Sequence, residues 1–266
     1  MPTPFQWFSL FVIVLATMGG GWAPLSRPRD QTKEAEGYPL GEAFAAGIFL
    51  ALSLTMMLPA SYTLLARALP GLNFPIASLI AIVSMLVLLG LTHMIRHLEE
   101  DLETDASQGA SPIVPVIMTV MIAIPSFFLG AVLGVSDTKQ ALLILIAILL
   151  HKTSAAFALA LKLSESSLAR SRARIVFGFF VSATPIGILA GSFAGSELAA
   201  NAVILARGVL LAMAAGTFLF MGTLNELQST PMIRRCRHWR GFTAMLLGLG
   251  LTTAARWLLG EAHSLG

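Results

Sequence analysis

The stretch QALLILIAILLHKTSAAFALALK, residues 140–162, decides the fold class of this chain. A helix rises about 1.5 Å per residue, so the stretch is long enough to cross a hydrocarbon core of about 30 Å. Deep inside it only two side chains can ionise, those of the neighbours His151 and Lys152. An apolar block of this length with so little charge predicts a membrane-spanning helix.

Seven further blocks of similar length accompany this stretch. Only 12% of the residues are charged and 56% are hydrophobic, whereas soluble domains have roughly 25% charged residues. The first block lacks a preceding basic segment and is long enough to span, so we expect a retained helix rather than a signal peptide. The sequence predicts an all-α polytopic membrane protein with one transmembrane domain, residues 1–266, and not an enzyme. The eight predicted spans cover residues 5–24, 40–62, 74–95, 113–134, 140–162, 173–195, 201–223 and 241–260.

The basic residues in the loops and towards the ends of the predicted spans divide unequally between the two sides of the membrane. Twelve lie on one side: Arg27, Arg29, Lys33, Arg96, Lys162, Arg170, Arg172, Arg174, Arg234, Arg235, Arg237 and Arg240. Four lie on the other: Arg67, Lys139, Arg207 and Arg256. Because positive loops stay in the cytoplasm, we expect both termini outside. The net charge of +3 comes from these short loops, so it implies no nucleic-acid partner.

Two of the spans share a short internal echo. Residues 44–52 read FAAGIFLAL and residues 213–221 read MAAGTFLFM, with five of nine positions identical. In the predicted topology these two helices run in opposite directions, as an inverted repeat of a secondary transporter requires. The alternative is that Ala-Ala-Gly recurs only because small residues let helices pack closely.

The buried ionisable pair is the first candidate for chemistry. Lys at the bilayer centre costs roughly 2.5 to 3.5 kcal/mol, which makes Lys152 a functional candidate. The His151 imidazole could bind a metal or accept a proton. Thr184, before Pro185, and Ser126 could line a pathway with them, because a proline inside a helix frees backbone carbonyls. The alternative is that both ionisable groups are satisfied by neighbouring hydroxyls and carbonyls.

A second charged region follows the third predicted span. We expect a loop there that could gather cations, although a charge run is more often a solvated face. The residues that could gather cations there are His93, His97, Glu99, Glu100, Asp101, Glu103 and Asp105.

Five stretches in order resemble the ZIP (zinc/iron-regulated transporter-like) family, and most closely the subfamily whose fifth span opens with His-Lys. They are FAAGIFLALSLTMMLP (44–59), PSFFLGAVLG (125–134), HKTSAAFALALKL (151–163), SATPIGILAG (182–191) and AAGTFLFM (214–221). The resemblance implies eight helices with both termini outside, an inverted repeat that relates spans 1 to 3 with spans 6 to 8, and divalent cation movement into the cytoplasm.

The resemblance also implies a metal site, and this chain departs from it. The family's span-four His and Glu fall on Pro125 and Leu129, and a span-five carboxylate falls on Ala155. The Asp or His before the Leu-Leu-Pro of span two falls on Met56. His151 keeps the family's span-five histidine, and Lys152 stands where other members complete a second metal site.

Further family positions are altered as well. The acidic residue after the proline of span two is Ala60, and a late acidic residue of span seven falls on Asn225, next to Glu226. At about 4 Å and an effective dielectric near 20, the charge of Lys152 would repel a divalent ion by about 8 kcal/mol. Either Lys152 gives up its proton during transport, or the centre does not hold a divalent ion as relatives do.

The sequence supports three functions to different degrees. The leading one is a ZIP-like permease for divalent cations, with zinc as the first candidate substrate and no cofactor, in which His151 lines the pathway. The alternative is a non-transporting homologue that serves as a regulatory or partner subunit, suggested by the lost ligands. Transport of an organic anion, drawn by Lys152, rests on one residue.

The surroundings of the protein follow from the same features. The partners we expect are the lipid bilayer and metal cations, and a homodimer is one expected assembly. The short loops favour a bacterial cytoplasmic membrane. The single Cys236 has no partner within the chain for a disulfide or a cysteine metal cluster.

Overall fold

The computed structural model describes residues 2–26, 39–105, 113–136, 138–166, 168–225 and 239–261. These residues form helices joined by short connections. Their order is α1 (Pro4–Ser26), α2 (Pro39–Ala51), the π-helix η1 (Leu52–Met57), α3 (Leu58–Ala68), α4 (Ile76–Asp105), α5 (Ile113–Gly134), α6 (Thr138–Glu165), α7 (Arg170–Glu197), α8 (Ala200–Leu219), the π-helix η2 (Phe220–Asn225) and α11 (Trp239–Glu261). The all-α class predicted from the sequence is confirmed.

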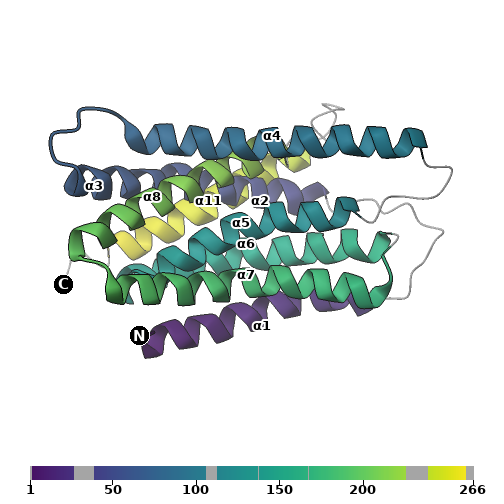
Figure 1. Cartoon of the computed structure of the whole chain (residues 1–266), viewed down its shortest axis with the longest axis horizontal. Coiled ribbons are helices and arrows are strands. Elements are labelled where there is room, and N and C mark those ends of the chain that lie inside the picture. Colours follow the sequence, from purple (N-terminus) through teal and green to yellow (C-terminus); the bar gives the residue numbers. More distant parts are fainter. Residues whose placement is uncertain are drawn as a thin grey trace.

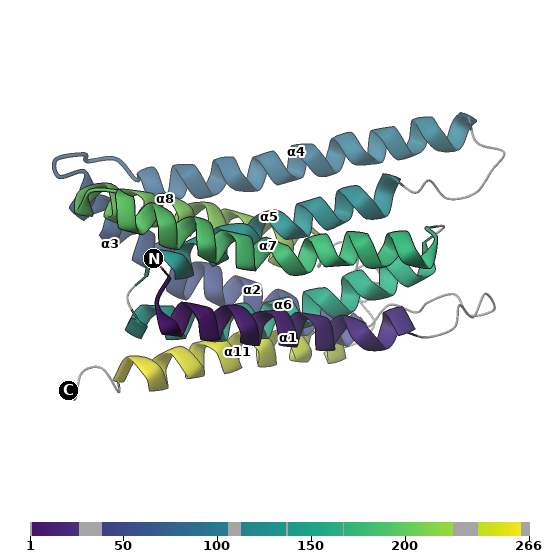
Figure 2. The same ribbon diagram turned by 60° about the horizontal axis from the view of Figure 1, so that its bottom comes forward.

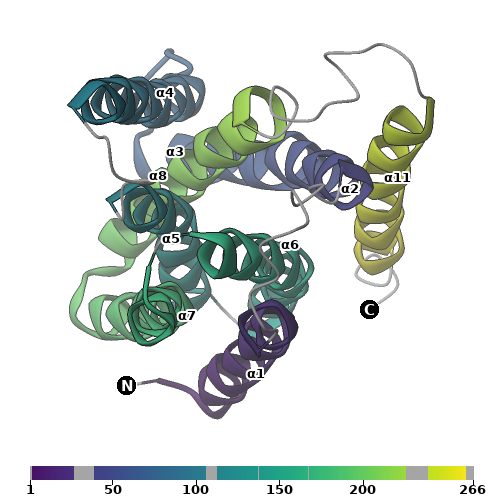
Figure 3. The same cartoon turned by 90° about the vertical axis from the view of Figure 1, so that its right-hand side faces the viewer.

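The helices lie roughly along one direction, and the start of α1 and the end of α11 lie at the same end of the bundle (Figure 1). Seen along that direction, α4 and α11 occupy opposite edges of the molecule (Figure 3). Five apolar stretches of the described residues are long enough to cross a membrane: Pro4–Trp22, Ala43–Ala68, Ile76–Met94, Arg170–Glu197 and Ala200–Thr223. Thr119–Gly134 is a shorter apolar helix. Helices also occupy the other predicted spans, and the count of eight spans stays a prediction.

The predicted loop after residue 95 is wrong in one respect. Helix α4 continues to Asp105, so the acidic run lies on its C-terminal part rather than in a loop. Glu and Leu favour helix and no Pro or Gly interrupts residues 91–105, so nothing local ends the helix there. The side chains of the acidic run lie outside those that the structure describes.

Pairs of helices pack along their lengths: α5 against α7, α1 against α6, α2 against α11, and both α3 and α4 against α8. The turned view separates α4 from α11, with the other helices between them (Figure 2). Glycines set the closest of these contacts. A Cβ added to Gly130 or Gly134 of α5 would lie 2.3 Å from a backbone oxygen of α7, and one added to Gly187 or Gly191 would lie 2.2 Å from a backbone oxygen of α5. Only glycine permits this approach.

The residues of the two similar segments, 44–52 and 213–221, make similar contacts in the structure. When residue 44 is aligned with 213, Phe49 falls on Phe218, and their ring centroids are 5.1 Å apart. Gly47 packs against the backbone of α11, and its counterpart Gly216 packs against the backbone of α4. The π-helix η1 follows the first echo, and η2 follows the second at a position shifted by one residue.

The contacts between these two segments are themselves reciprocal. Ser53 donates a hydrogen bond of 2.8 Å to the Ala215 carbonyl. In the same alignment Ser53 falls on Gly222 and Ala215 on Ala46, and Gly222 lies against the Ala46 carbonyl. Equivalent residues that contact each other reciprocally are the arrangement expected around a two-fold axis.

Candidate functional site

The amine of Lys152 reaches from α6 to α7 and is almost completely buried, with 1% of the residue exposed. Its Nζ donates to the carbonyl oxygen of Phe180 at 3.1 Å and to the Thr184 hydroxyl at 2.7 Å. It also lies 4.4 Å from the centroid of the Phe180 ring, within the range of a cation–π contact. Three contacts with one helix therefore stabilise the group that is most costly to bury.

The Thr184 hydroxyl continues this chain of hydrogen bonds to α5. It accepts from Lys152 and donates to the Ser126 carbonyl oxygen at 3.1 Å. The Ser126 hydroxyl donates to the Ile122 carbonyl of its own helix, so it points away from this chain. The result is a polar link from α6 through α7 to α5.

Three of the four predicted pathway residues, Lys152, Thr184 and Ser126, thus come together on three helices. His151 lies in α6, but its side chain is outside those that the structure describes. Pro185 directly follows Thr184 inside α7 and offers no N–H to the carbonyl one turn before it. Lys152 binds the adjacent carbonyl, that of Phe180.

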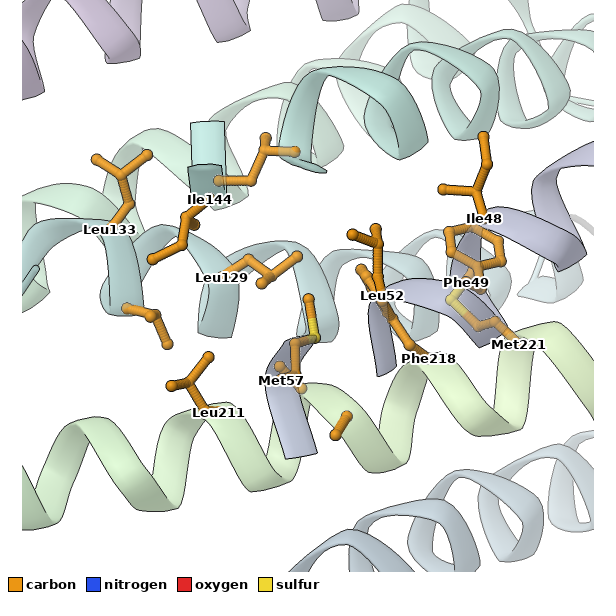
Figure 4. Packing of buried hydrophobic residues seen from close by; sticks show 14 of the residues in the cluster. Ile48, Phe49, Leu52, Met57, Leu129, Leu133, Ile144, Leu211, Phe218 and Met221 are labelled. Carbon is orange, nitrogen blue, oxygen red and sulfur yellow. The ribbon is translucent and has the colours of Figure 1, made fainter. Parts of the chain in front are cut away.

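The positions of the missing ligands lie in apolar surroundings. Leu129 is fully buried in a cluster shared by α5, α6, α8 and η1. In Figure 4 it lies close to Met57 of η1. Met56 and Ala155 are half-buried and Pro125 is buried. A group of three or more His, Cys, Asp or Glu side chains that could hold a metal is not found among the described residues.

The sequence did not single out Phe180 or Gln6. Phe180 is fully buried and supplies two of the three contacts of Lys152. Gln6, near the start of α1, donates to the Gly134 carbonyl of α5 at 2.7 Å and accepts from Ser192 of α7 at 3.0 Å. A glutamine within the apolar stretch 5–24 was the available signal for this second link.

Two sets of hydrogen bonds between helices stand out in the part of the chain that the structure describes. One set joins α1, α5, α6 and α7 through Gln6, Lys152 and Thr184. The other joins α3 and η1 to α8, where Ser61 donates to the Gly208 carbonyl and Ser53 to the Ala215 carbonyl. The apolar cluster around Leu129 lies between them, and the Thr92 hydroxyl also lies 4.0 Å from the Met121 sulfur across this boundary.

Comparison with known proteins gives a consistent picture. The family model described as ZIP Zinc transporter matches residues 97–254. The bovine protein named Zinc transporter ZIP1 is 28% identical over 242 residues, 77% of this chain and 74% of that protein. Its human counterpart is 30% identical over 226 residues, 71% of this chain and 68% of that protein. Zinc transporter ZIP9-A of Xenopus laevis is 31% identical over 141 residues, which cover 52% of this chain and 46% of that protein.

Proposed function

This chain belongs to the ZIP zinc transporter family, and we propose on that basis that it is a permease that moves divalent cations, zinc first among them, into the cytoplasm. The match over residues 97–254 carries the proposal. The family consists of transporters rather than enzymes, and the apolar helices make the chain an integral membrane protein. Zinc is the substrate of this proposal, not a resident cofactor.

The altered site bears on how the cation is held. With Leu129 and Pro125 in the family's ligand positions, His151 is the proposed ligand from α6, and the Thr184 hydroxyl is already engaged twice. Lys152 then acts as a built-in cation between α5, α6 and α7, in the place where other members complete a second metal site. A permease of this kind needs only one cation in its pathway.

The similarity between residues 44–52 and 213–221 supports an inverted repeat as the basis of the fold. Phe49 and Phe218 meet at equivalent positions, and Gly47 and Gly216 each pack against the last helix of the opposite half. Inverted repeats are common in secondary transporters, which expose one central site to each side in turn. We place the moving boundary at the apolar cluster between the two hydrogen-bonded sets, because apolar contacts are less directional than hydrogen bonds.

The position of the basic residues predicts the orientation of the protein in the membrane. Gln6 binds the C-terminal ends of α5 and α7, so the N-terminus lies at the end opposite the start of α7. The start of α7 carries the exposed Arg170, Arg172 and Arg174. By the positive-inside rule we propose that this basic end is cytoplasmic and both termini are outside. A bacterial cytoplasmic membrane and a homodimer remain parts of the proposal, and the relatives above come from vertebrates.

Uptake of radioactive zinc into proteoliposomes tests the function. Wild-type protein should give saturable uptake, and His151→Ala should reduce it to the level of empty liposomes. Uptake no greater than in empty liposomes, from protein shown to be folded, would favour the non-transporting homologue instead. Names of the matched relatives favour the permease between these two functions.

A further inference from the structure

Lys152 is held by α7 rather than by its own helix. Both hydrogen-bond acceptors of the amine and the ring beneath it come from two residues one turn apart, Phe180 and Thr184. Lysine has a flexible four-carbon side chain, so its charge can occupy many places unless something fixes it. The position of this charge therefore depends on α7.

Thr184 is itself fixed. Its hydroxyl donates to the Ser126 carbonyl of α5, so it presents its lone pairs to Lys152. The Thr184 carbonyl lies against Gly130, where an added Cβ would come within 2.3 Å of it. Because α5 and α7 touch backbone to backbone here, Thr184 cannot move far without separating the two helices.

Phe180 is equally constrained. It is fully buried, and its ring centroid lies 6.2 Å from that of Phe177 on the same helix. The Phe180 carbonyl and ring therefore contact the Lys152 amine from one side, and the Thr184 hydroxyl contacts it from the other. These three groups together form the cradle of Lys152.

We infer that Thr184 and Phe180 are positioning residues that hold the Lys152 charge against α7 and so keep it at a fixed distance from the transported cation. This inference rests on the proposed function for the cation, while the cradle itself rests on the distances above. A released Lys152 amine can take up other positions around α6 on its flexible side chain, including positions nearer to a cation bound by His151. The repulsion grows as that distance shortens.

The test compares Thr184→Val with Thr184→Ser in zinc uptake by proteoliposomes. Valine keeps the shape of threonine and removes the hydroxyl, whereas serine keeps the hydroxyl. We expect Thr184→Val to raise KM for zinc about tenfold, which corresponds to about 1.4 kcal/mol, and to change the maximal rate much less. Thr184→Ser should restore KM to within about twofold of wild type. Equal effects of the two variants would overturn the inference.

The same substitutions made in Lys152→Met protein distinguish a positioning role of Thr184 from a merely structural role. In Lys152→Met protein there is no charge to position, so Thr184→Val should no longer change KM for zinc. Phe180→Leu, which keeps the carbonyl and removes the ring, should follow the same rule with a smaller effect. If Thr184→Val raises KM as much in the Lys152→Met background as in wild type, Thr184 has a merely structural role.

The inference can also be tested if the wild-type protein takes up no zinc and the proposed function fails. Thermal unfolding of the single and double variants at positions 152 and 184 measures their coupling in detergent. Contacting residues should give melting temperatures that depart from additivity by at least about 2 °C. Additive shifts would overturn the cradle itself, whatever the protein transports.

Discussion

Burial of Lys152 in the membrane costs free energy, and the residue makes specific contacts there. A lysine at mid-membrane costs roughly 2.5 to 3.5 kcal/mol, and two hydrogen bonds and an aromatic face offset that cost here. The sequence identified Lys152 because a charge inside an apolar stretch is conspicuous. It could not identify Phe180, because a phenylalanine among apolar residues carries no signal until the fold brings it under the amine.

Removal of the charge should strengthen cation binding. We expect Lys152→Met to lower KM for zinc severalfold, because methionine fills a similar volume without repelling a divalent ion. Uptake into proteoliposomes over a range of zinc concentrations measures this. Arg174→Met is the control, since it removes an exposed charge at the far end of α7 and should leave KM unchanged. A higher KM in Lys152→Met would show that the charge assists the cation instead of opposing it.

Restored ligands should create a tighter site. The double change Pro125→His with Leu129→Glu returns the two side chains that the family places on span four, and we expect zinc affinity to rise at least tenfold in calorimetric titration. Leu129→Glu alone should lower the melting temperature, because Leu129 is fully buried and a carboxylate there has no partner.

Zinc should then raise the melting temperature of the double variant more than that of wild type, since a ligand stabilises the state that binds it. No gain in affinity, for protein that is still folded, would mean that Pro125 and Leu129 do not lie at the cation site.

At the scale of elements, the crossing of α5 and α7 supports the site. Glycines on both helices bring the backbones together, and this approach places Thr184 within reach of the Ser126 carbonyl. The spacings Gly130–Gly134 and Gly187–Gly191 favour close packing, but they do not indicate which helix each pair contacts. Partner choice depends on the fit of whole faces, and several similar apolar helices offer many nearly equal alternatives.

Two substitutions on α7 test this crossing. A Cβ at Gly187 would lie 2.2 Å from the Phe127 carbonyl, whereas a Cβ at Gly178 would meet nothing within 4 Å. We expect Gly187→Ala to lower the melting temperature by several degrees and Gly178→Ala to leave it unchanged or raise it slightly, because alanine favours helix over glycine. Circular dichroism in detergent measures both. Equal melting temperatures for the two variants would contradict the observed crossing.

For the molecule as a whole, the positions of the four tryptophans predict where the membrane lies. All four are exposed, with Trp7 and Trp22 towards the two ends of α1 and Trp239 and Trp257 towards the two ends of α11. The members of each pair are separated by about 22 Å and about 27 Å along the helix, at about 1.5 Å per residue. Tryptophan prefers the interface between lipid and water, so these separations fit the thickness of the hydrocarbon core of a membrane.

Depth-dependent quenching checks this placement. With quenching groups attached at different positions along the lipid chains, tryptophan fluorescence should be reduced most by groups near the headgroups and least by groups at the bilayer centre. Variants that keep a single tryptophan, with the others changed to phenylalanine, assign each signal. Strongest quenching from the bilayer centre would contradict the proposed position of α1 and α11 in the membrane.

The sequence predicted the fold more completely than it predicted the candidate site. Length and hydropathy place the helices because the bilayer imposes one simple requirement on every span. The extension of α4 to Asp105 was missed because hydropathy marks the end of the apolar core and not the end of a helix. At the site, Lys152, Thr184 and Ser126 were chosen as separate polar residues, and their link through α7 depends on a helix contact that no local pattern encodes.

The most direct test of the account is uptake of radioactive zinc into proteoliposomes by wild-type protein, His151→Ala and empty liposomes, measured side by side. A permease with one cation in its pathway predicts saturable uptake by the wild type that is lost in His151→Ala, while both proteins keep similar melting temperatures. Uptake by the wild type that does not exceed that of empty liposomes would contradict the proposed function. Undiminished uptake by His151→Ala would place the pathway away from α6.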